Sequence, residues 1–213
     1  MDTPVFSIII GCEHDAESLR KTLQGLAEIK RPGRIEILVL DNEKAPGRLA
    51  VVEQSRSPGL DIRYLPMPGI PRAAAWNAAV RESSAEYLAF LDDDCVPDVN
   101  WLSACRESLD DWNTGVVGGP DKAPKDSTVF ERCLDYALTS FIGTLGMRRG
   151  SERVVKYHPR PWNMAARREA VVLSGGFDEN CPEAPESPMI RRMDQIGYRS
   201  AYHPDGFVWH RRE

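Results

Sequence analysis

The chain has 213 residues, and its 27 Lys and Arg residues against 32 Asp and Glu residues give a formal net charge of −5. This length predicts one domain whose core needs no disulfide or metal to hold it together, and the acidic balance argues against nucleic acid as a partner. Five cysteines stand in no metal-like spacing, which indicates a reducing, cytoplasmic compartment: Cys12, Cys95, Cys105, Cys133 and Cys181.

Strand and helix patterns alternate through the first half of the chain. Apolar, β-branched runs are typical of buried parallel strands, and apolar residues at helical spacing predict helices between them. The alternation predicts a Rossmann-like, mostly parallel sheet with helices on both faces, and ligands at the carboxyl ends of the strands. Strands are expected over 5–10, 35–40, 60–65 and 87–91, and helices over 16–29 and 71–83.

The second half is less regular, and no repeat or linker divides it from the first. A helix is predicted over 128–145, with a capping box of Thr128 and Glu131 and a broad apolar stripe. A basic, glycine-containing break over 148–153 predicts a mobile loop. Short elements are expected over 116–117, 169–173, 189–196, 199–202 and 207–210.

Three consecutive aspartates follow the strand over 87–91. Asp92, Asp93 and Asp94 repel one another unless a cation neutralises them, and Mg²⁺ and Mn²⁺ prefer oxygen ligands. A turn can direct Asp92 and Asp94 toward one point while Asp93 faces elsewhere. A solvated acidic turn is the alternative, but the position at the ligand-binding edge of the sheet favours a metal site.

Asp41 and Asn42 end the strand over 35–40. A carboxylate and an amide at this edge can hydrogen-bond a nucleobase or a ribose. Both residue types also favour plain turns, so this pair alone leaves both interpretations open.

Taken together, the motifs resemble the inverting glycosyltransferases of family 2, which have the GT-A fold, over about residues 5–212. The resemblance is to members that assemble exopolysaccharides and other cell-surface glycans. The strand that leads into Asp92-Asp93-Asp94 and the later Gly175-Gly176-Phe177-Asp178-Glu179 are specific as an ordered pair. The other matching segments are 6–10, 36–42, Gly69-Ile70-Pro71-Arg72 with Asn77, 85–97, 163–168, Gly197-Tyr198-Arg199, His203-Pro204-Asp205 and Trp209-His210-Arg211-Arg212.

The resemblance implies a nucleoside-diphosphate-sugar donor and a divalent metal, Mg²⁺ or Mn²⁺. Asp92 and Asp94 match the DxD motif that holds the metal against the diphosphate, and His210 stands where some GT-A enzymes supply a further metal ligand. Arg72, together with Arg148 or Arg149, would offset phosphate charge; for the arginines and for His210 a purely structural or surface role is the alternative. The expected donor-nucleotide set is Asp41, Asn42, Arg72, Asn77, Asp92 and Asp93.

An inverting transfer also needs a general base for the acceptor hydroxyl. Counting back from Gly197-Tyr198 places Glu186 where the family has the Asp of a Gly-Glu-Asp-like motif, and Pro185 where it has the Glu. Glu186 is therefore the candidate base and Glu183 the reserve. The alternative is two exposed glutamates in a proline-rich loop.

The chain departs from the family pattern at three turns. Gly11-Cys12-Glu13-His14 replaces a Pro-Thr-Tyr-Asn-like turn, and Asp41-Asn42-Glu43-Lys44 replaces an Asp-Asp-Gly-Ser-like one. Ala75-Trp76-Asn77 stands for the usual Ala-Arg-Asn, which removes an arginine able to pair with phosphate. These changes leave the donor open, so a non-catalytic sugar-nucleotide-binding or partner-binding domain is the alternative function. A phosphatase is disfavoured, because that chemistry normally starts from an aspartate on the first strand, and in this chain the first strand ends in Gly11-Cys12.

The resulting prediction is a metal-dependent inverting glycosyltransferase in a single GT-A domain over 1–213. Residues to about 98 form the nucleotide-sugar-binding half, and residues from about 99 form the acceptor-binding half for a saccharide or lipid-linked acceptor. The sequence contains neither a membrane span of ~20 apolar residues nor the basic start of a signal peptide. Because related proteins continue into hydrophobic segments, and carry a comparable helix at 128–145, we expect peripheral association with the inner face of the cytoplasmic membrane; packing of that helix on the sheet is the alternative.

Overall fold

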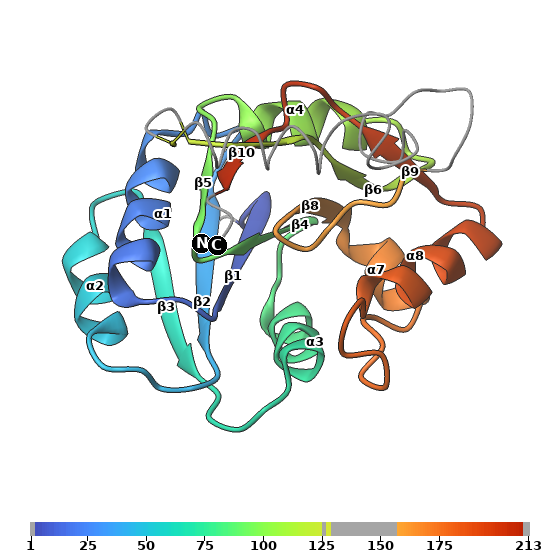
Figure 1. Cartoon of the computed structure of the whole chain (residues 1–213). Coiled ribbons are helices and arrows are strands. Elements are labelled where there is room, and N and C mark those ends of the chain that lie inside the picture. Colours follow the sequence, from blue (N-terminus) through green and yellow to red (C-terminus); the bar gives the residue numbers. More distant parts are fainter. Residues whose placement is uncertain (1–2, 125–126, 129–156, 211–213) are drawn as a thin grey trace.

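A computed structural model describes residues 3–124, 127–128 and 157–210 (Figure 1). Two expectations fall on residues outside these ranges. The helix predicted over 128–145 lies outside them apart from Thr128, and so does the loop predicted over 148–153 with Arg148 and Arg149.

The first half of the chain alternates strand and helix as predicted. Every residue of the first, second and fourth strands is buried, because these apolar runs are covered on both faces of the sheet. Helix α1 begins where the Asp15 side chain accepts a hydrogen bond from the Ser18 amide at 2.8 Å. The strands are β1 (Phe6–Cys12), β2 (Ile35–Asp41), β3 (Asp61–Pro66) and β4 (Tyr87–Asp92), and the helices are α1 (Ala16–Glu28), α2 (Arg48–Ser55) and α3 (Arg72–Glu82).

The second half adds shorter strands and three described helices. The strands are β5 (Cys95–Pro97), β6 (Thr114–Gly118), β7 (Asp121–Lys122), β8 (Asn163–Arg167), β9 (Arg199–Tyr202) and β10 (Val208–His210). The helices are α4 (Trp101–Leu109), α7 (Arg168–Leu173) and α8 (Glu186–Gln195).

Both halves share one seven-stranded sheet with the order β3-β2-β1-β4-β8-β6-β9. The pairs within β1 to β4 are parallel, as is β6 with β9, whereas β8 runs antiparallel to both of its neighbours. A second sheet has the order β5-β10-β7, so it joins residues just after the aspartates to the end of the chain. The predicted mixed α/β fold with a mostly parallel sheet is confirmed.

Helices cover both faces of the large sheet (Figure 1). On one face, residues of α1, α2 and α4 such as Leu23, Val52 and Trp101 pack in one core cluster. On the other face, residues of α3 and α8 such as Trp76 and Met189 pack in a second cluster. Residues at the carboxyl ends of β1 and β2 line a pocket together with the start of α3, which positions the site.

Three sequence interpretations need correction. The helix expected to begin at Met189 begins at Glu186, with Pro185 as its N-cap. Pro188 fits within the first turn, because the amides there have no intrahelical acceptor and a missing N–H costs no bond. Helices α2 and α4 were not predicted.

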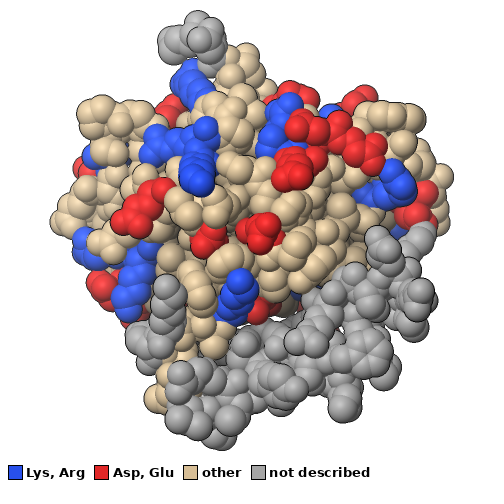
Figure 2. All heavy atoms as spheres, turned by 90° about the horizontal axis from the view of Figure 1, so that it is seen from above, with Lys and Arg blue, Asp and Glu red and all other residues tan. Residues whose placement is uncertain are grey.

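Acidic and basic side chains are interspersed on the face seen in Figure 2. Among the described residues, none of the helices has the length and apolar character required to cross a membrane.

Candidate active site

The three aspartates after β4 point to three different partners. Asp92 pairs with the guanidinium of Arg72, and Asp94 lies 3.1 Å from Nε2 of His210. Asp93 is fully buried and accepts hydrogen bonds from the backbone amides of Glu13 and His14 at 3.1–3.2 Å. The repulsion expected from the sequence is thus relieved within the protein, by a separate cation or donor set for each carboxylate.

Asp93 holds the turn at the end of β1. Its Oδ1 also lies 2.8 Å from Nδ1 of His14, and the Thr22 hydroxyl donates to its backbone carbonyl at 2.8 Å. Burial would lower the pKa of His14, but the hydrogen bond to Asp93 and the nearby aspartate charges raise it above its ordinary value. The Asp93 carboxylate therefore organises the β1 turn, and it shares His14 with Asp94, which lies 3.6 Å from Nε2 of that histidine.

Asp94 and His210 come together because β10 pairs with β5. His210 lies opposite Cys95 in this antiparallel ladder, and Cys95 directly follows Asp94. Burial would raise the pKa of Asp94, but the hydrogen bond from His210 and the charges of both histidines hold it below its usual range. The Asp94 carboxylate is therefore held in its ionised form, and the side chains of Asp94 and His210 are 10% and 18% exposed.

Among the described residues, Asp94, Cys95 and His210 form a group whose potential metal-ligand atoms all lie within 4.8 Å of one another. Two of the three predicted metal ligands, Asp94 and His210, are thus brought together, and Cys95 was missed. Asp92, the third, is directed to Arg72 instead. Its pKa is raised to about 6, because burial outweighs the attraction of Arg72.

Arg72 is the positive centre of this edge. Its guanidinium pairs with Asp92, lies 3.0 Å from Glu13, and stacks over the Trp76 ring at 4.4 Å. Burial would lower the pKa of Arg72, but the charges of Asp92, Glu13 and Glu186 raise it above its ordinary value. The arginine stays charged, and it feels both the aspartate cluster and the candidate base.

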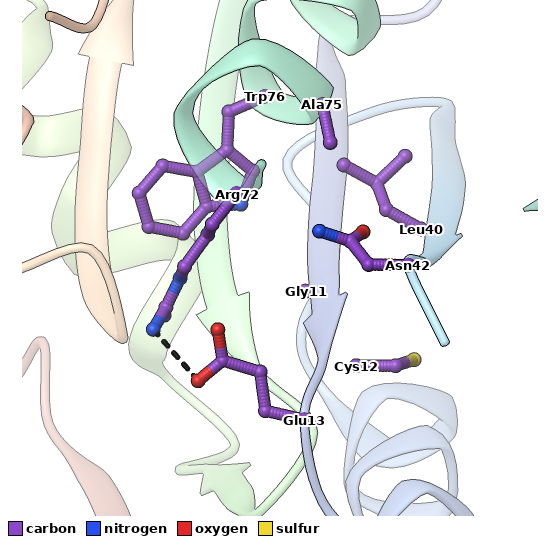
Figure 3. Close-up of a pocket in the computed structure, with 8 residues that line it drawn as sticks. All are labelled: Gly11, Cys12, Glu13, Leu40, Asn42, Arg72, Ala75 and Trp76. Atoms are coloured by element: carbon purple, nitrogen blue, oxygen red, sulfur yellow. Dashed lines mark hydrogen bonds and ion pairs between the residues drawn. The ribbon is translucent and has the colours of Figure 1, made fainter. Parts of the chain in front are cut away.

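A pocket opens beside Arg72 between the ends of β1 and β2 and the start of α3 (Figure 3). Trp76 packs so closely on β1 that a Cβ at Gly11 would meet its Nε1 at 3.3 Å. Asn42 donates to the Ile70 carbonyl at 2.8 Å and so ties the turn after β2 to the segment before α3. The pocket is lined by Gly11, Cys12, Glu13, Leu40, Asn42, Arg72, Ala75 and Trp76.

Asp41 lies fully buried behind this pocket. Its carboxylate accepts from the Lys44 amide at 2.8 Å, from Arg48 at 2.7 Å and from the Tyr64 hydroxyl at 2.6 Å. The Glu43 amide donates to it as well, at 3.2 Å. Four donors match the ~4 lone-pair sites of a carboxylate, so Asp41 fixes the turn that presents Asn42. Direct contact of Asp41 with a nucleoside stays a prediction.

Asn77 ties α3 to the segment that follows α7. Its amide group accepts from the Phe177 amide at 2.9 Å and donates to the Phe177 carbonyl and the Glu179 carboxylate at 3.0 and 2.8 Å. It therefore joins two of the motifs quoted for the family resemblance. Its predicted place in the donor-nucleotide set stays a prediction.

Glu186 is buried at the first position of α8, with its side chain 2% exposed, and Arg160 donates to it at 2.9 Å. Its charge is among those that raise the pKa of Arg72. Glu183 is exposed in the preceding turn. The two glutamates thus differ in burial: Glu186 is buried and Glu183 is exposed, a difference that the sequence did not reveal.

Four contributors were missed by the sequence reasoning. His14 and Glu13 follow the first strand and Cys95 follows the aspartates, so their positions at strand ends were available as a signal. Arg160 lies far from Glu186 in sequence, and no local pattern pointed to it.

The fold is the GT-A fold of glycosyltransferases. A mannosyltransferase from Pyrobaculum calidifontis, PcManGT, solved in complex with GDP-Man and Mn²⁺, superposes with a TM-score of 0.77 at 21% sequence identity. The match covers 99% of this chain and 57% of that one.

The chain belongs to glycosyl transferase family 2, whose family model matches residues 7–172. It is 24% identical over 206 residues to the glycosyltransferase AglE of Haloferax volcanii, covering 95% of this chain and 65% of that protein. It is 32% identical over 127 residues to the succinoglycan biosynthesis protein ExoM of Rhizobium meliloti, covering 58% and 41%. The chain therefore spans less than two thirds of the length of either relative.

Proposed function

We propose that the protein is a metal-dependent inverting glycosyltransferase that moves a sugar from a nucleoside-diphosphate donor to a saccharide or lipid-linked acceptor. The observation that carries this proposal is the meeting of Asp94 and His210 at 3.1 Å, next to the strand end at which Asp92 pairs with Arg72. This supports a metal site with a fixed positive charge beside it, in a chain of the glycosyl transferase family 2.

The proposed metal is Mg²⁺ or Mn²⁺. An ionised carboxylate and an imidazole fit such an ion, and Asp92 is close enough to Asp94 for their charges to interact. In this proposal Asp94 and His210 hold the metal, and Asp92, the other aspartate of the DxD motif, completes the acidic edge beside them. When bound, the ion neutralises charge on the departing nucleoside diphosphate. PcManGT, solved with GDP-Man and Mn²⁺, is consistent with this assignment.

The chain's own residues bind the donor around the pocket. Arg72 supplies a fixed positive charge for the diphosphate, because it lies between Asp92 and Glu13 at the pocket wall. Asn42, held by Asp41, offers its amide near the nucleoside. Trp76 contributes an indole surface where other family members have an arginine, so the phosphate charge falls more heavily on Arg72.

Glu186 is the proposed general base. It takes the proton from the acceptor hydroxyl as that oxygen attacks the anomeric carbon and the nucleoside diphosphate leaves, which inverts the configuration in a single displacement. Arg160 orients the carboxylate. The residues from about 99 onward form the acceptor side, and a lipid-linked acceptor would bring the protein to the inner face of the cytoplasmic membrane.

Donor binding tests the proposed metal and nucleotide sites. We expect calorimetric titration with UDP, GDP, CDP and TDP to show binding of at least one nucleotide that requires Mn²⁺ and is lost in Asp94→Ala. Asp61→Ala is the matched control. Asp61 is a half-exposed aspartate on the edge strand β3, and it pairs with Arg34 instead of with residues of the proposed site. Failure of all four nucleotides to bind with Mn²⁺ would sink the proposal.

Turnover tests the base. With the nucleotide that binds, we expect Glu186→Gln to lower nucleoside diphosphate release from the matching donor by about 10²–10⁴-fold at unchanged donor affinity. Glu183→Gln, in the exposed turn, is the control. Unchanged turnover in Glu186→Gln would remove it from the mechanism. Nucleotide binding without any turnover in the unmodified protein would instead support the non-catalytic sugar-nucleotide-binding alternative.

A further inference from the structure

Cys95 brings a sulfur ligand to the proposed metal site. Its side chain is fully buried, and its Sγ donates to Oδ1 of Asp94 at 3.4 Å. The β5–β10 ladder places it opposite His210, so both flank the same carboxylate. Nothing in the chemistry of a magnesium or manganese site calls for sulfur, because these ions select oxygen ligands.

The spacing of the three ligand atoms suits a small tetrahedral ion. Zinc bonds of about 2.0–2.3 Å place neighbouring ligand atoms roughly 3.3–3.8 Å apart. Oδ2 of Asp94 lies 3.1 Å from Nε2 of His210, its other oxygen Oδ1 lies 3.4 Å from Sγ of Cys95, and one ligand atom from each of the three residues lies within 4.8 Å of the others. His14, with Nε2 3.6 Å from Asp94, lies next to the set.

An ion can reach this set from solvent. Cys95 is enclosed, but Asp94 and His210 keep exposed fractions of 10% and 18% and form the open side. Zn²⁺, Co²⁺ and Cd²⁺ accept mixed oxygen, nitrogen and sulfur ligands, whereas a thiolate adds little for Mg²⁺ or Mn²⁺.

We propose that Asp94, Cys95 and His210 form a site for thiophilic divalent cations such as Zn²⁺, in which the Cys95 thiolate is a direct ligand. Binding replaces the thiol proton, which passes to solvent, and no electron is transferred. This site shares Asp94 and His210 with the metal site of the proposed glycosyltransferase. If that proposed function holds, a thiophilic ion bound here occupies the ligands of the donor-bound metal and inhibits sugar transfer.

Cobalt absorption tests the sulfur ligand without nucleotide or turnover. We expect Co²⁺ titration of the unmodified chain to produce a thiolate-to-cobalt charge-transfer band in the near ultraviolet, which Cys95→Ser abolishes. Cys181→Ser is the control, because this half-buried cysteine donates only to the Ala184 carbonyl at 3.6 Å. A band that persists in Cys95→Ser, or no band in the unmodified chain, overturns the proposal.

Affinity supplies the second readout. Loss of even an outer partner of a metal ligand costs about 10–100-fold in affinity, so Cys95→Ser should weaken Zn²⁺ binding by more than about 10-fold. Binding of Mn²⁺, followed by electron paramagnetic resonance, should change by less than about 3-fold, because Mn²⁺ gains little from sulfur. Equal loss for both ions, or no loss for Zn²⁺, contradicts a direct thiolate ligand.

Cadmium spectroscopy tests the sulfur ligand in the unmodified protein, so it still applies if Cys95→Ser fails to fold. The ¹¹³Cd chemical shift of the unmodified protein reports a bound sulfur directly, and a shift typical of oxygen and nitrogen ligands alone overturns the proposal. The two proposals also fail separately. Nucleotide binding with Mn²⁺ but no sulfur band leaves the glycosyltransferase function standing, whereas a sulfur band without nucleotide binding leaves only the cation site.

Discussion

Buried carboxylates at the edge of the sheet each have a donor set inside the protein. Asp41 and Asp93 are fully buried, and each accepts backbone amides from the turn beside it. This arrangement fixes the turns on which Asn42, Glu13 and His14 stand. The buried aspartates Asp41 and Asp93 thus have a structural role, and the residues proposed to bind the ligand lie next to them in the sequence.

The Asp41–Arg48 pair predicts a pH-dependent stability. Burial would raise the pKa of Asp41, but Tyr64, Arg48 and the Lys44 amide hold it below 3.8. The ionised form therefore stabilises the fold above the unfolded value of 3.8, and that stabilisation disappears as the pH falls through the lower folded pKa. Asp41→Asn should lose about 3 kcal/mol at neutral pH, because the buried Arg48 loses its closest counter-ion and keeps only the exposed Glu43 at 3.6 Å.

Urea denaturation over a pH series measures this effect. The difference between the unmodified protein and Asp41→Asn should narrow below pH 3.8. Asp61→Asn, on the half-exposed edge of β3, should change stability by less than about 0.5 kcal/mol throughout. A difference that stays constant from neutral to acidic pH would rule out the ionised carboxylate as its source.

Arg160 is expected to position the candidate base. Its guanidinium is 45% exposed while Glu186 is 2% exposed, so the arginine orients the carboxylate from the solvent side. Arg160→Ala should lower kcat by about 10–100-fold with unchanged donor affinity, because the reacting oxygen is misplaced. Arg160→Lys should recover part of kcat. Arg191 is exposed on helix α8, which also carries Glu186, and Arg191→Ala should have no effect. If kcat is unchanged in Arg160→Ala, the arginine has no positioning role.

At the scale of the elements, the strands of the parallel half followed directly from their apolar runs. Helix α2 escaped prediction because it buries only Arg48, Val51 and Val52, too few for a recognisable stripe. Helix α4 does carry one, with Trp101, Leu102, Cys105 and Leu109 buried at helical spacing, but it is short and follows directly on the polar turn after β5. Pairing partners such as β8 between β4 and β6 depend on contacts far apart in sequence.

The connection between α3 and the segment after α7 predicts a matched pair of glycine variants. Gly176 has φ +73°, and a Cβ there would lie 2.6 Å from Oδ1 of Asn77, which accepts the Phe177 amide. Gly176→Ala should therefore lose about 2–4 kcal/mol, from backbone strain and a displaced hydrogen-bonded amide. Gly175→Ala, at φ +80° and with the added Cβ 4.0 Å from Nε of Arg192, should lose about 1–2 kcal/mol from strain alone. Equal losses in urea denaturation would show that the Asn77 connection contributes nothing.

At the scale of the whole molecule, the site depends on bringing the end of the described chain back to its middle. The sequence predicted Asp92 and Asp94 from their place after a strand, but only the family resemblance pointed to His210, because no spacing rule connects residues so far apart. The structure supplies the connection through the small sheet β5-β10-β7. It also explains Glu186, whose burial and Arg160 partner depend on α8 packing against the large sheet.

Ligand binding should therefore tighten the small sheet selectively. Asp94 precedes β5 and His210 ends β10, so an ion held by both links the two strands. In hydrogen exchange, the nucleotide that binds, added with Mn²⁺, should slow the amides of Cys95–Pro97 and Val208–His210, because opening this sheet then requires release of the ligand. Amides of the distant edge strand Asp61–Pro66 should exchange unchanged, and Asp94→Ala should remove the protection. Uniform slowing across all three strands would instead indicate general stabilisation, and would contradict a metal bridge between β5 and β10.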